Sequence, residues 1–191
     1  MNKTITEFLI RQIPSFPNLH RRDSLIFKLV DKFIKLYISG LRKKNSEFID
    51  ISPYNYHGNL LWPKINLGKV DSYCFFELPE MILHYYYYVN KNNYKIAVDL
   101  GSNIGIDTIL MSKNGFQTYG FEPDTELYNK MLKNSKLNNL KNVKLFNKGI
   151  SDKRETLNMV KVLDNQAANH IEGSRSFYGS SKKIKIEVIP F

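Results

Sequence analysis

One stretch, residues 95–124, constrains the fold of this chain more than any other; it reads KIAVDLGSNIGIDTILMSKNGFQTYGFEPD. It begins with a short apolar run, Lys95–Leu100, that stops at a glycine, which is typical of a fully buried parallel strand. Gly101 and Gly105 then bracket three residues, so the backbone can turn sharply and approach a ligand where a Cβ would obstruct it. Asn103, between them, tolerates a positive φ better than other non-glycine residues. The stretch therefore begins with a predicted strand and a glycine turn.

A helix and a second strand are predicted after the turn. Apolar residues recur at helical spacing, and the helix should end in a left-handed cap at Asn114–Gly115; the apolar residues are Ile104, Ile106, Ile109 and Leu110. Gln117–Phe121 is the second strand, and Glu122 stands at its carboxyl end before Pro123, which ends the strand. Ligands of open α/β sheets lie at the carboxyl ends of the strands, so we expect the glycine turn and Glu122 to face one crevice. A carboxylate there can accept both hydroxyls of a ribose. Together with Asp99, which precedes the turn, this pattern predicts a nucleoside-containing cofactor.

The spacing of the glycines separates two classes of cofactor. The dinucleotide fingerprint G-x-G-x-x-G uses its second glycine to bring the backbone against a pyrophosphate. Here the spacing is G-x-x-x-G, and that second glycine is absent. S-adenosylmethionine has no phosphate, and its amino-acid end needs only a turn with free backbone groups for its carboxylate and a nearby acceptor for its ammonium group. The spacing therefore favours S-adenosylmethionine over NAD, with a tight turn that binds no ligand as the structural alternative.

The next elements continue the alternation of helix and strand. Thr125–Leu140 is predicted to be a helix capped by Asp124 or Thr125, and Asn138 is expected to tie down the turn that follows. Val143–Phe146 is predicted to be the third parallel strand, and residues 147–152 are its carboxyl tip. We expect Gly149 and Ile150, with their neighbours Lys148, Ser151 and Asp152, to border the adenine ring. An ordinary strand-end loop is the alternative.

The last part of the chain predicts a two-stranded ribbon. Glu155–Leu163 and Lys183–Pro190 both alternate in the manner of strands, and they are joined by a polar loop, residues 164–181. Four residues of this loop could meet a polyol acceptor or lie on a solvated surface: His170, Glu172, Arg175 and Tyr178.

Three ordered motifs carry a family resemblance: VDLGSNIGIDTI, then YGFEPD, then LKNSKLNNLKNVKLFNKGISD. Over about residues 67–191 they resemble the FkbM-type class I S-adenosylmethionine-dependent methyltransferases. The resemblance implies an α/β fold with a Rossmann-like sheet over residues 67–191, preceded by a helical and irregular extension over residues 1–66. It also implies methyl transfer to an oxygen of a sugar, lipid or other small molecule. The predicted donor-binding residues are Asp99, Gly101, Ser102, Asn103, Gly105, Glu122, Pro123, Gly149 and Ile150, and no metal is expected.

The resemblance ends at Phe191. Members of the family continue through a helix into a strand bearing K-I-D-x-E-G, and none of that follows here. The first strand, Lys95–Leu100, would then lack a neighbour on one side and leave a hydrophobic edge. We therefore expect an incomplete sheet, as in a truncated product or in half of a split enzyme whose missing strands come from a second chain.

Catalytic residues are not identified by any motif. An acceptor alcohol must lose its proton, and a histidine or carboxylate could take it. His84, Asp107 and His170 are the candidates, and none of them matches a family motif. Glu80 and Tyr85 lie in a predicted helix from about Pro79, a segment that in the family often closes over the donor; packing in the core is the alternative for both.

An amphipathic helix is predicted over Arg22–Leu41, because apolar residues repeat there at three and four. Such a helix could pack over the catalytic domain, lie on a membrane surface as a peripheral contact, or pair with a partner. Met1–Ile13 is predicted to be a shorter helix, broken by Pro14 and Pro17.

Composition limits which partners and which cellular compartment fit this chain. The formal net charge is +10, but the lysines are scattered and no aromatic RNA-binding motif accompanies them, so nucleic acid is not the expected partner. The single cysteine, Cys74, excludes an intrachain disulfide and fits a reducing compartment. No run approaches the roughly 20 apolar residues that span a bilayer, and no secretion signal is evident, which predicts a cytoplasmic protein. A donor-binding module without catalysis and an NAD-linked reductase remain the alternatives to a methyltransferase.

Overall fold

The structure is a computed structural model that describes residues 16, 21–42, 77–176 and 179–191. These residues fall into two units, one with helices α2 and α3 and one with every described residue from Lys95 to Phe191. The predicted domain boundary at residues 66 and 67 lies outside the described residues, as does the predicted helix over Met1–Ile13.

The first unit confirms two predicted helices. Helix α2 spans Leu25–Arg42, and the Ser24 hydroxyl accepts a hydrogen bond from the Phe27 N–H at its start, 3.1 Å away. Helix α3 spans Leu78–Asn90 and has Pro79 in its first turn, where the missing N–H is not needed. Within the described part of the chain, no helix combines the length and the apolar character that crossing a bilayer requires.

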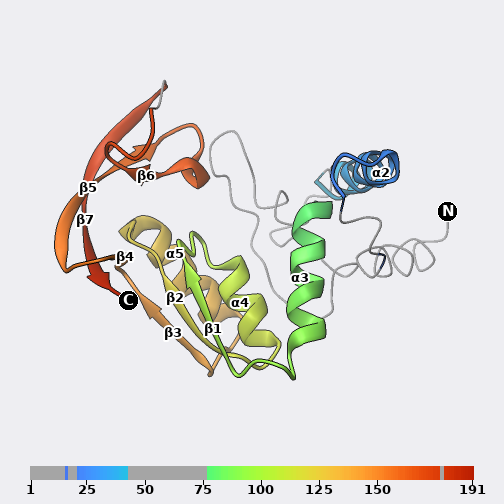
Figure 1. The fold of residues 1–191 in the computed structure, drawn as a ribbon, viewed down its shortest axis with the longest axis horizontal. Helices are drawn as coiled ribbons and strands as arrows, with labels where there is room; N and C mark the ends of the chain where they lie inside the picture. Colours follow the sequence, from blue (N-terminus) through green and yellow to red (C-terminus); the bar gives the residue numbers. More distant parts are fainter. Residues whose placement is uncertain (1–15, 17–20, 43–76, 177–178) are drawn as a thin grey trace. The chain divides into compact units, whose positions relative to one another are not determined.

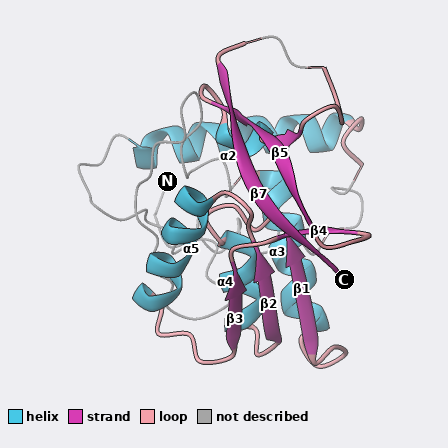
Figure 2. Cartoon of the chain, turned by 90° about the vertical axis from the view of Figure 1, so that its left-hand side faces the viewer, coloured by secondary structure: helices cyan, strands magenta, loops and turns pink. Residues whose placement is uncertain are grey.

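The second unit is built on a parallel three-stranded sheet (Figures 1 and 2). Its strands are β1 (Ile96–Leu100), β2 (Gln117–Phe121) and β3 (Val143–Phe146), in that order. Helix α4 (Ile106–Lys113) connects β1 to β2, and helix α5 (Thr125–Leu137) connects β2 to β3. The predicted alternation of strands and helices is confirmed, and α5 ends three residues earlier than predicted. The fold is therefore α/β.

The two faces of this sheet differ. The register pairs Asp99 with Gly120, and a Cβ built on Gly120 would lie 2.9 Å from the Thr108 hydroxyl of α4, so this face packs against helices. On the opposite face, the three apolar side chains of β1 are 39–61% exposed: Ile96, Val98 and Leu100. The prediction of a fully buried first strand is therefore wrong. Among the described strands, β1 pairs with β2 alone.

A second sheet adjoins the first and contains the predicted ribbon. Strand β5 (Glu155–Val162) pairs antiparallel with β7 (Ser181–Pro190) from Glu155 opposite Val188 to Val162 opposite Ser181, which confirms the ribbon. A small apolar core forms between the strands from Met159, Ile186 and Val188.

Two short strands complete the second sheet and depart from the predictions. Residues 149–151, predicted to lie in the carboxyl tip of the third strand, form the separate strand β4 (Gly149–Ser151), which pairs parallel with β7. The predicted loop between the ribbon strands contains the 3-10 helix η5 (Gln166–Ala168) and strand β6 (His170–Ile171), which pairs with β5. The two short strands were missed because their partner strands, β7 and β5, are distant in the chain.

Candidate functional site

The glycine turn has the backbone conformation that its sequence predicted. The φ angles of Gly101, Asn103 and Gly105 are +79°, +52° and +87°, all in the left-handed region. A Cβ on Gly105 would lie 2.6 Å from the Cγ of Met131, whereas a Cβ on Gly101 would meet nothing within 4 Å. Gly105 is therefore required both by its conformation and by the close approach of α5.

Every N–H group of residues 101–105 donates a hydrogen bond within the protein. The Phe121 carbonyl accepts the first two, at 2.9 Å each, and a carboxylate oxygen of Glu122 accepts the third, at 2.7 Å. The side-chain oxygen of Asn103 accepts the fourth, and the carbonyl of Ser102 accepts the fifth. The turn therefore keeps no free backbone N–H for a ligand, so the expectation that free backbone groups here bind the carboxylate of the donor is wrong.

Asp99 forms hydrogen bonds with the first turn of helix α4. Its carboxylate accepts hydrogen bonds from the hydroxyl and the backbone N–H of Thr108. Burial raises the pKa of Asp99, and the hydrogen bonds from Thr108 and Ser102 oppose that rise. The positive end of the helix dipole, where a phosphate would otherwise be favoured, thus already faces a carboxylate of the protein.

Glu122 joins the turn to the end of β2. Its side chain is 5% exposed; Oε2 accepts from the Asn103 N–H at 2.7 Å, and Oε1 accepts from the Asp124 N–H at 2.8 Å. Burial raises the pKa of Glu122 to about 7; the two N–H donors act against this rise, and the nearby carboxylates of Asp124 and Asp99 add to it. The sequence placed the turn and Glu122 at one crevice, and the structure brings them into direct contact.

A cavity of about 110 Å³ opens beside this contact. The parallel sheet and its connections contribute Gly101, Asn103, Glu122, Pro123 and Leu127, and the second sheet with its 3-10 helix contributes Met159, Gln166, Ala167 and Asn169. The volume is below the roughly 300 Å³ at which sites for whole small molecules begin. The cavity therefore suits a fragment such as a sugar ring, with the rest of a ligand outside it.

The predicted donor-binding residues divide into three groups. Four line the cavity: Gly101, Asn103, Glu122 and Pro123. Three shape the turn around it: Asp99, Ser102 and Gly105. The last two, Gly149 and Ile150, lie in β4 and are not among the residues that line the cavity. A Cβ on Gly149 would lie 2.9 Å from the Val188 side chain, so packing between β4 and β7 accounts for that glycine.

Sequence reasoning missed the half of the cavity that the second sheet supplies. Gln166 is the clearest case, because its buried Oε1 has no hydrogen-bond partner among the described residues. An unsatisfied buried acceptor is costly, so this oxygen suits a donor brought by a ligand. Nothing in the polar loop sequence distinguishes Gln166 from a solvated residue.

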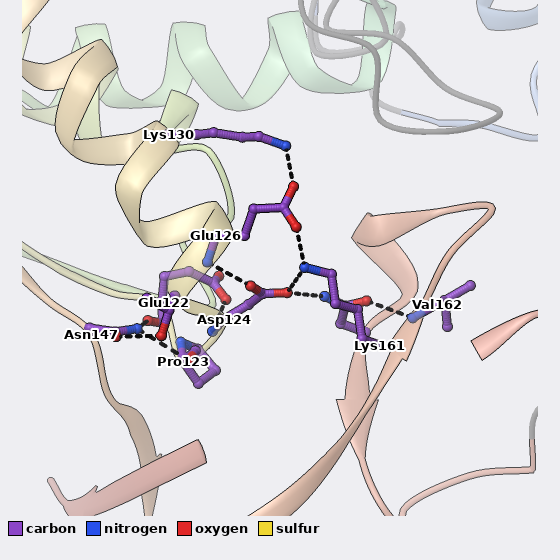
Figure 3. A network of polar contacts seen from close by, with 10 residues as sticks. Glu122, Pro123, Asp124, Glu126, Lys130, Asn147, Lys161 and Val162 are labelled. Carbon is purple, nitrogen blue, oxygen red and sulfur yellow. Dashed lines mark hydrogen bonds and ion pairs between the residues drawn. The ribbon is translucent and has the colours of Figure 1, made fainter. Parts of the chain in front are cut away.

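A buried ion pair attaches the second sheet to the site (Figure 3). The Lys161 side chain is 4% exposed, and its Nζ lies 2.7 Å from both Asp124 Oδ2 and Glu126 Oε2. Burial lowers the pKa of Lys161, but hydrogen bonds to Asp124 and Glu126 outweigh it, so the pKa lies above the ordinary value. Hydrogen bonds from Lys130 and Lys161 lower the pKa of Glu126 to about 2. Lys161 and Glu126 therefore stay charged at neutral pH.

Asp124 is the point where helix, ribbon and cavity meet. It caps α5 by accepting from the Glu126 N–H at 2.8 Å, as predicted, and it also accepts from the Asn169 side chain at 3.4 Å. Asn169 in turn accepts from the Val162 N–H at 2.9 Å. The residues that follow β5 are thereby held against the start of α5.

Three asparagines tie the turn and the strand ends to α5 and β3. Asn134 donates to the Ile104 carbonyl of the glycine turn at 2.9 Å, and Asn138 donates to the Asn134 carbonyl at 2.8 Å. Asn147, after β3, donates to the backbone carbonyls of Glu122 and Pro123 (Figure 3). The predicted role of Asn138 at the end of α5 fits this arrangement, but Asn134 makes the contact with the turn.

The candidate bases are not brought to the cavity. His170 lies in β6 with Nδ1 3.0 Å from the Ala168 carbonyl, and Asp107 lies in the first turn of α4; neither lines the cavity. His84, with Glu80 and Tyr85, belongs to α3 in the other unit.

The loop residues suggested for a polyol acceptor have other contacts. Glu172 pairs with Lys183, and Arg175 donates to the Ala168 carbonyl. Tyr178 lies outside the described residues.

Comparisons with protein-family models, with curated proteins and with solved structures each found no match to this chain. The function is therefore inferred from the residues and geometry of the site.

Proposed function

We propose that this chain binds S-adenosylmethionine at the glycine turn and Glu122, and that it serves in transferring the methyl group to a hydroxyl of a sugar, lipid or other small molecule. One observation carries the proposal: the Asn103 N–H and the Glu122 carboxylate meet at a cavity at the carboxyl ends of β1 and β2. The parallel sheet is compatible with a Rossmann-like class I methyltransferase fold, in which a donor would occupy this position.

The polar groups of the cavity suit the ribose of such a donor. An ionised carboxylate has about four acceptor sites, and the two backbone N–H groups occupy two of those on Glu122. Once Glu122 is ionised, above its pKa of about 7, the remaining sites can accept the two O–H groups of a vicinal diol. Gln166 Oε1 offers a further acceptor from the other wall. When bound, S-adenosylmethionine supplies a methyl group that its sulfonium already activates.

The same contacts weigh against NAD. A pyrophosphate at a strand–turn–helix junction needs free backbone N–H donors, and those of residues 101–105 all have acceptors within the protein. Asp99 also places a carboxylate at the start of α4, where it would repel a second anion if ionised. The adenosine part of S-adenosylmethionine carries no anion and avoids both costs, whereas its carboxylate needs donors outside residues 101–105.

The chain's residues are assigned to donor binding and orientation. Holding the donor in one geometry beside the acceptor lowers the entropic part of the barrier to methyl transfer. His170 and Asp107 do not line the cavity, so neither is assigned as the base. Donor binding does not depend on which group removes the proton of the acceptor alcohol.

Calorimetric titration with S-adenosylhomocysteine and with NAD tests the proposal. We expect S-adenosylhomocysteine to bind and NAD not to bind. Glu122→Ala should weaken S-adenosylhomocysteine roughly 100-fold, because it removes charged hydrogen bonds to the ribose. Glu122→Gln keeps the shape and one acceptor, so its affinity for S-adenosylhomocysteine should lie between those of the wild type and Glu122→Ala. Glu172→Gln, at an exposed position, is the matched control and should bind S-adenosylhomocysteine as the wild type does.

Equal binding by the wild type and Glu122→Ala would contradict the site, and binding of NAD instead would favour the reductase. Donor binding with no transfer of labelled methyl to any acceptor would favour the non-catalytic module.

A further inference from the structure

Helix α2 carries a row of apolar side chains on an exposed face. Five residues form this apolar row and are 38–71% exposed: Leu25, Ile26, Leu29, Phe33 and Leu36. Phe27 and Ile34, on the other side of the helix, are buried. The single apolar stripe that the sequence predicted is thus divided, and only one part of it is covered.

Basic residues flank the apolar row. Lys28 follows Leu25 by three positions, and Lys32 follows Leu29 by three, so the two lysines lie beside the row on the helix surface. Lys35 is also exposed and pairs with Asp31 at 2.7 Å. Over residues 21–42, basic residues outnumber the acidic ones, Asp23 and Asp31. The exposed face is therefore apolar with a cationic border.

We propose that this face of α2 binds an anionic lipid surface, with the apolar row among the headgroups and the lysines at the lipid phosphates. Helices that lie in the plane of a membrane interface combine Leu and Phe on one face with Lys beside them, and long lysine stems reach outward to the headgroups. The net charge of +10 adds attraction to an anionic leaflet.

Charge complementarity selects this occupant over two others. A second copy of the chain would bring the same lysines against each other, and like charges across an interface are unfavourable. A nucleic acid could take the lysines but would leave the apolar row in water, since its backbone offers phosphates and no apolar surface. An anionic bilayer satisfies both parts of the face. The inference does not depend on donor binding.

Vesicle flotation of the full chain tests the inference. We expect binding to phosphatidylcholine vesicles that contain phosphatidylglycerol and little binding to phosphatidylcholine alone. Lys28→Gln with Lys32→Gln should weaken binding roughly 25-fold, at about fivefold per lysine near an anionic surface. Leu29→Gln with Leu36→Gln should weaken it roughly tenfold or more, because it withdraws apolar area from the interface.

The matched control is Leu83→Gln with Val89→Gln, which removes two exposed apolar side chains from α3 and leaves the charge unchanged. This control should bind like the wild type. Three results would overturn the inference: no binding to anionic vesicles, equal weakening by the α3 control, or a wild-type dimer in light scattering that the α2 leucine variant dissociates. The last result would assign the row to a second copy.

Discussion

The two walls of the candidate cavity are held in place by different forces. The wall from the parallel sheet depends on backbone hydrogen bonds, because Phe121 accepts from the turn and the turn donates to Glu122. The wall from the second sheet depends on side chains, because Lys161 and Asn169 bind Asp124. The first wall follows from one local strand–turn–helix unit, whereas the second requires residues distant in the chain to meet.

Because of this difference, we expect different substitutions to disrupt the two walls of the cavity. A buried ion pair contributes little net stability, but removing one partner leaves the other charge buried and unpaired. Substitutions at Lys161 should therefore release the second wall, whereas substitutions in the turn should damage the first. Four predictions test this contrast, beginning with the largest expected effect.

Lys161→Met should lower the free energy of unfolding by about 4 kcal/mol, because it leaves Asp124 buried without its cation. The control is Lys183→Met, which breaks an exposed pair with Glu172 and should lower stability far less, because solvent screens that pair. Urea unfolding measures both. Equal losses would show that the buried pair does not hold the second sheet.

Gly105→Ala should lower the free energy of unfolding by about 3 kcal/mol. The alanine would be strained by the left-handed backbone conformation, and its Cβ would also clash with Met131. Gly101→Ala meets open space and should cost about 1 kcal/mol from strain alone. Thermal unfolding of the two variants separates the cost of backbone strain from the cost of the clash with Met131. If both variants lost the same amount, the close approach of α5 would not matter.

Glu122 should make stability depend on pH. Its pKa is about 7 in the folded chain and ordinary when unfolded, so the folded state holds the proton between those values. This contribution is complete below the unfolded pKa and is lost as pH rises towards 7, by up to about 1.4 kcal/mol per pH unit. Unfolding across this range should show that the wild type loses more stability than Glu122→Gln, which keeps only the contributions of other groups such as Asp99; parallel curves would contradict the raised pKa.

Asn134→Ala should lower the free energy of unfolding by about 1 kcal/mol, because it leaves the Ile104 carbonyl without its buried donor. Lys133→Ala, one position earlier on the exposed side of α5, should have almost no effect. Denaturant midpoints compare them, and matching midpoints would remove Asn134 from the support of the turn.

Sequence patterns were sufficient where structure depends on near neighbours. The glycine turn needs positive φ at Gly101 and Gly105, and the chain supplies glycine there. The alternation in β5 and β7 was enough to predict their pairing, although the connection between them, residues 163–180, is long. Glu122 was placed at the turn because strands β1 and β2 are parallel and adjacent.

From the sequence we could predict the alternation of β1 to β3 with α4 and α5, the glycine turn and the carboxylate beside it, because periodicity and backbone preference act within a few residues. Tertiary structure alone decided that Gln166 lines the cavity, that Lys161 is buried, and that β1 and α2 each expose an apolar face. The physical reason is that burial depends on which elements pack together. A polar residue in a loop, or an apolar residue on a strand or helix, has the same local sequence whether it meets protein or water.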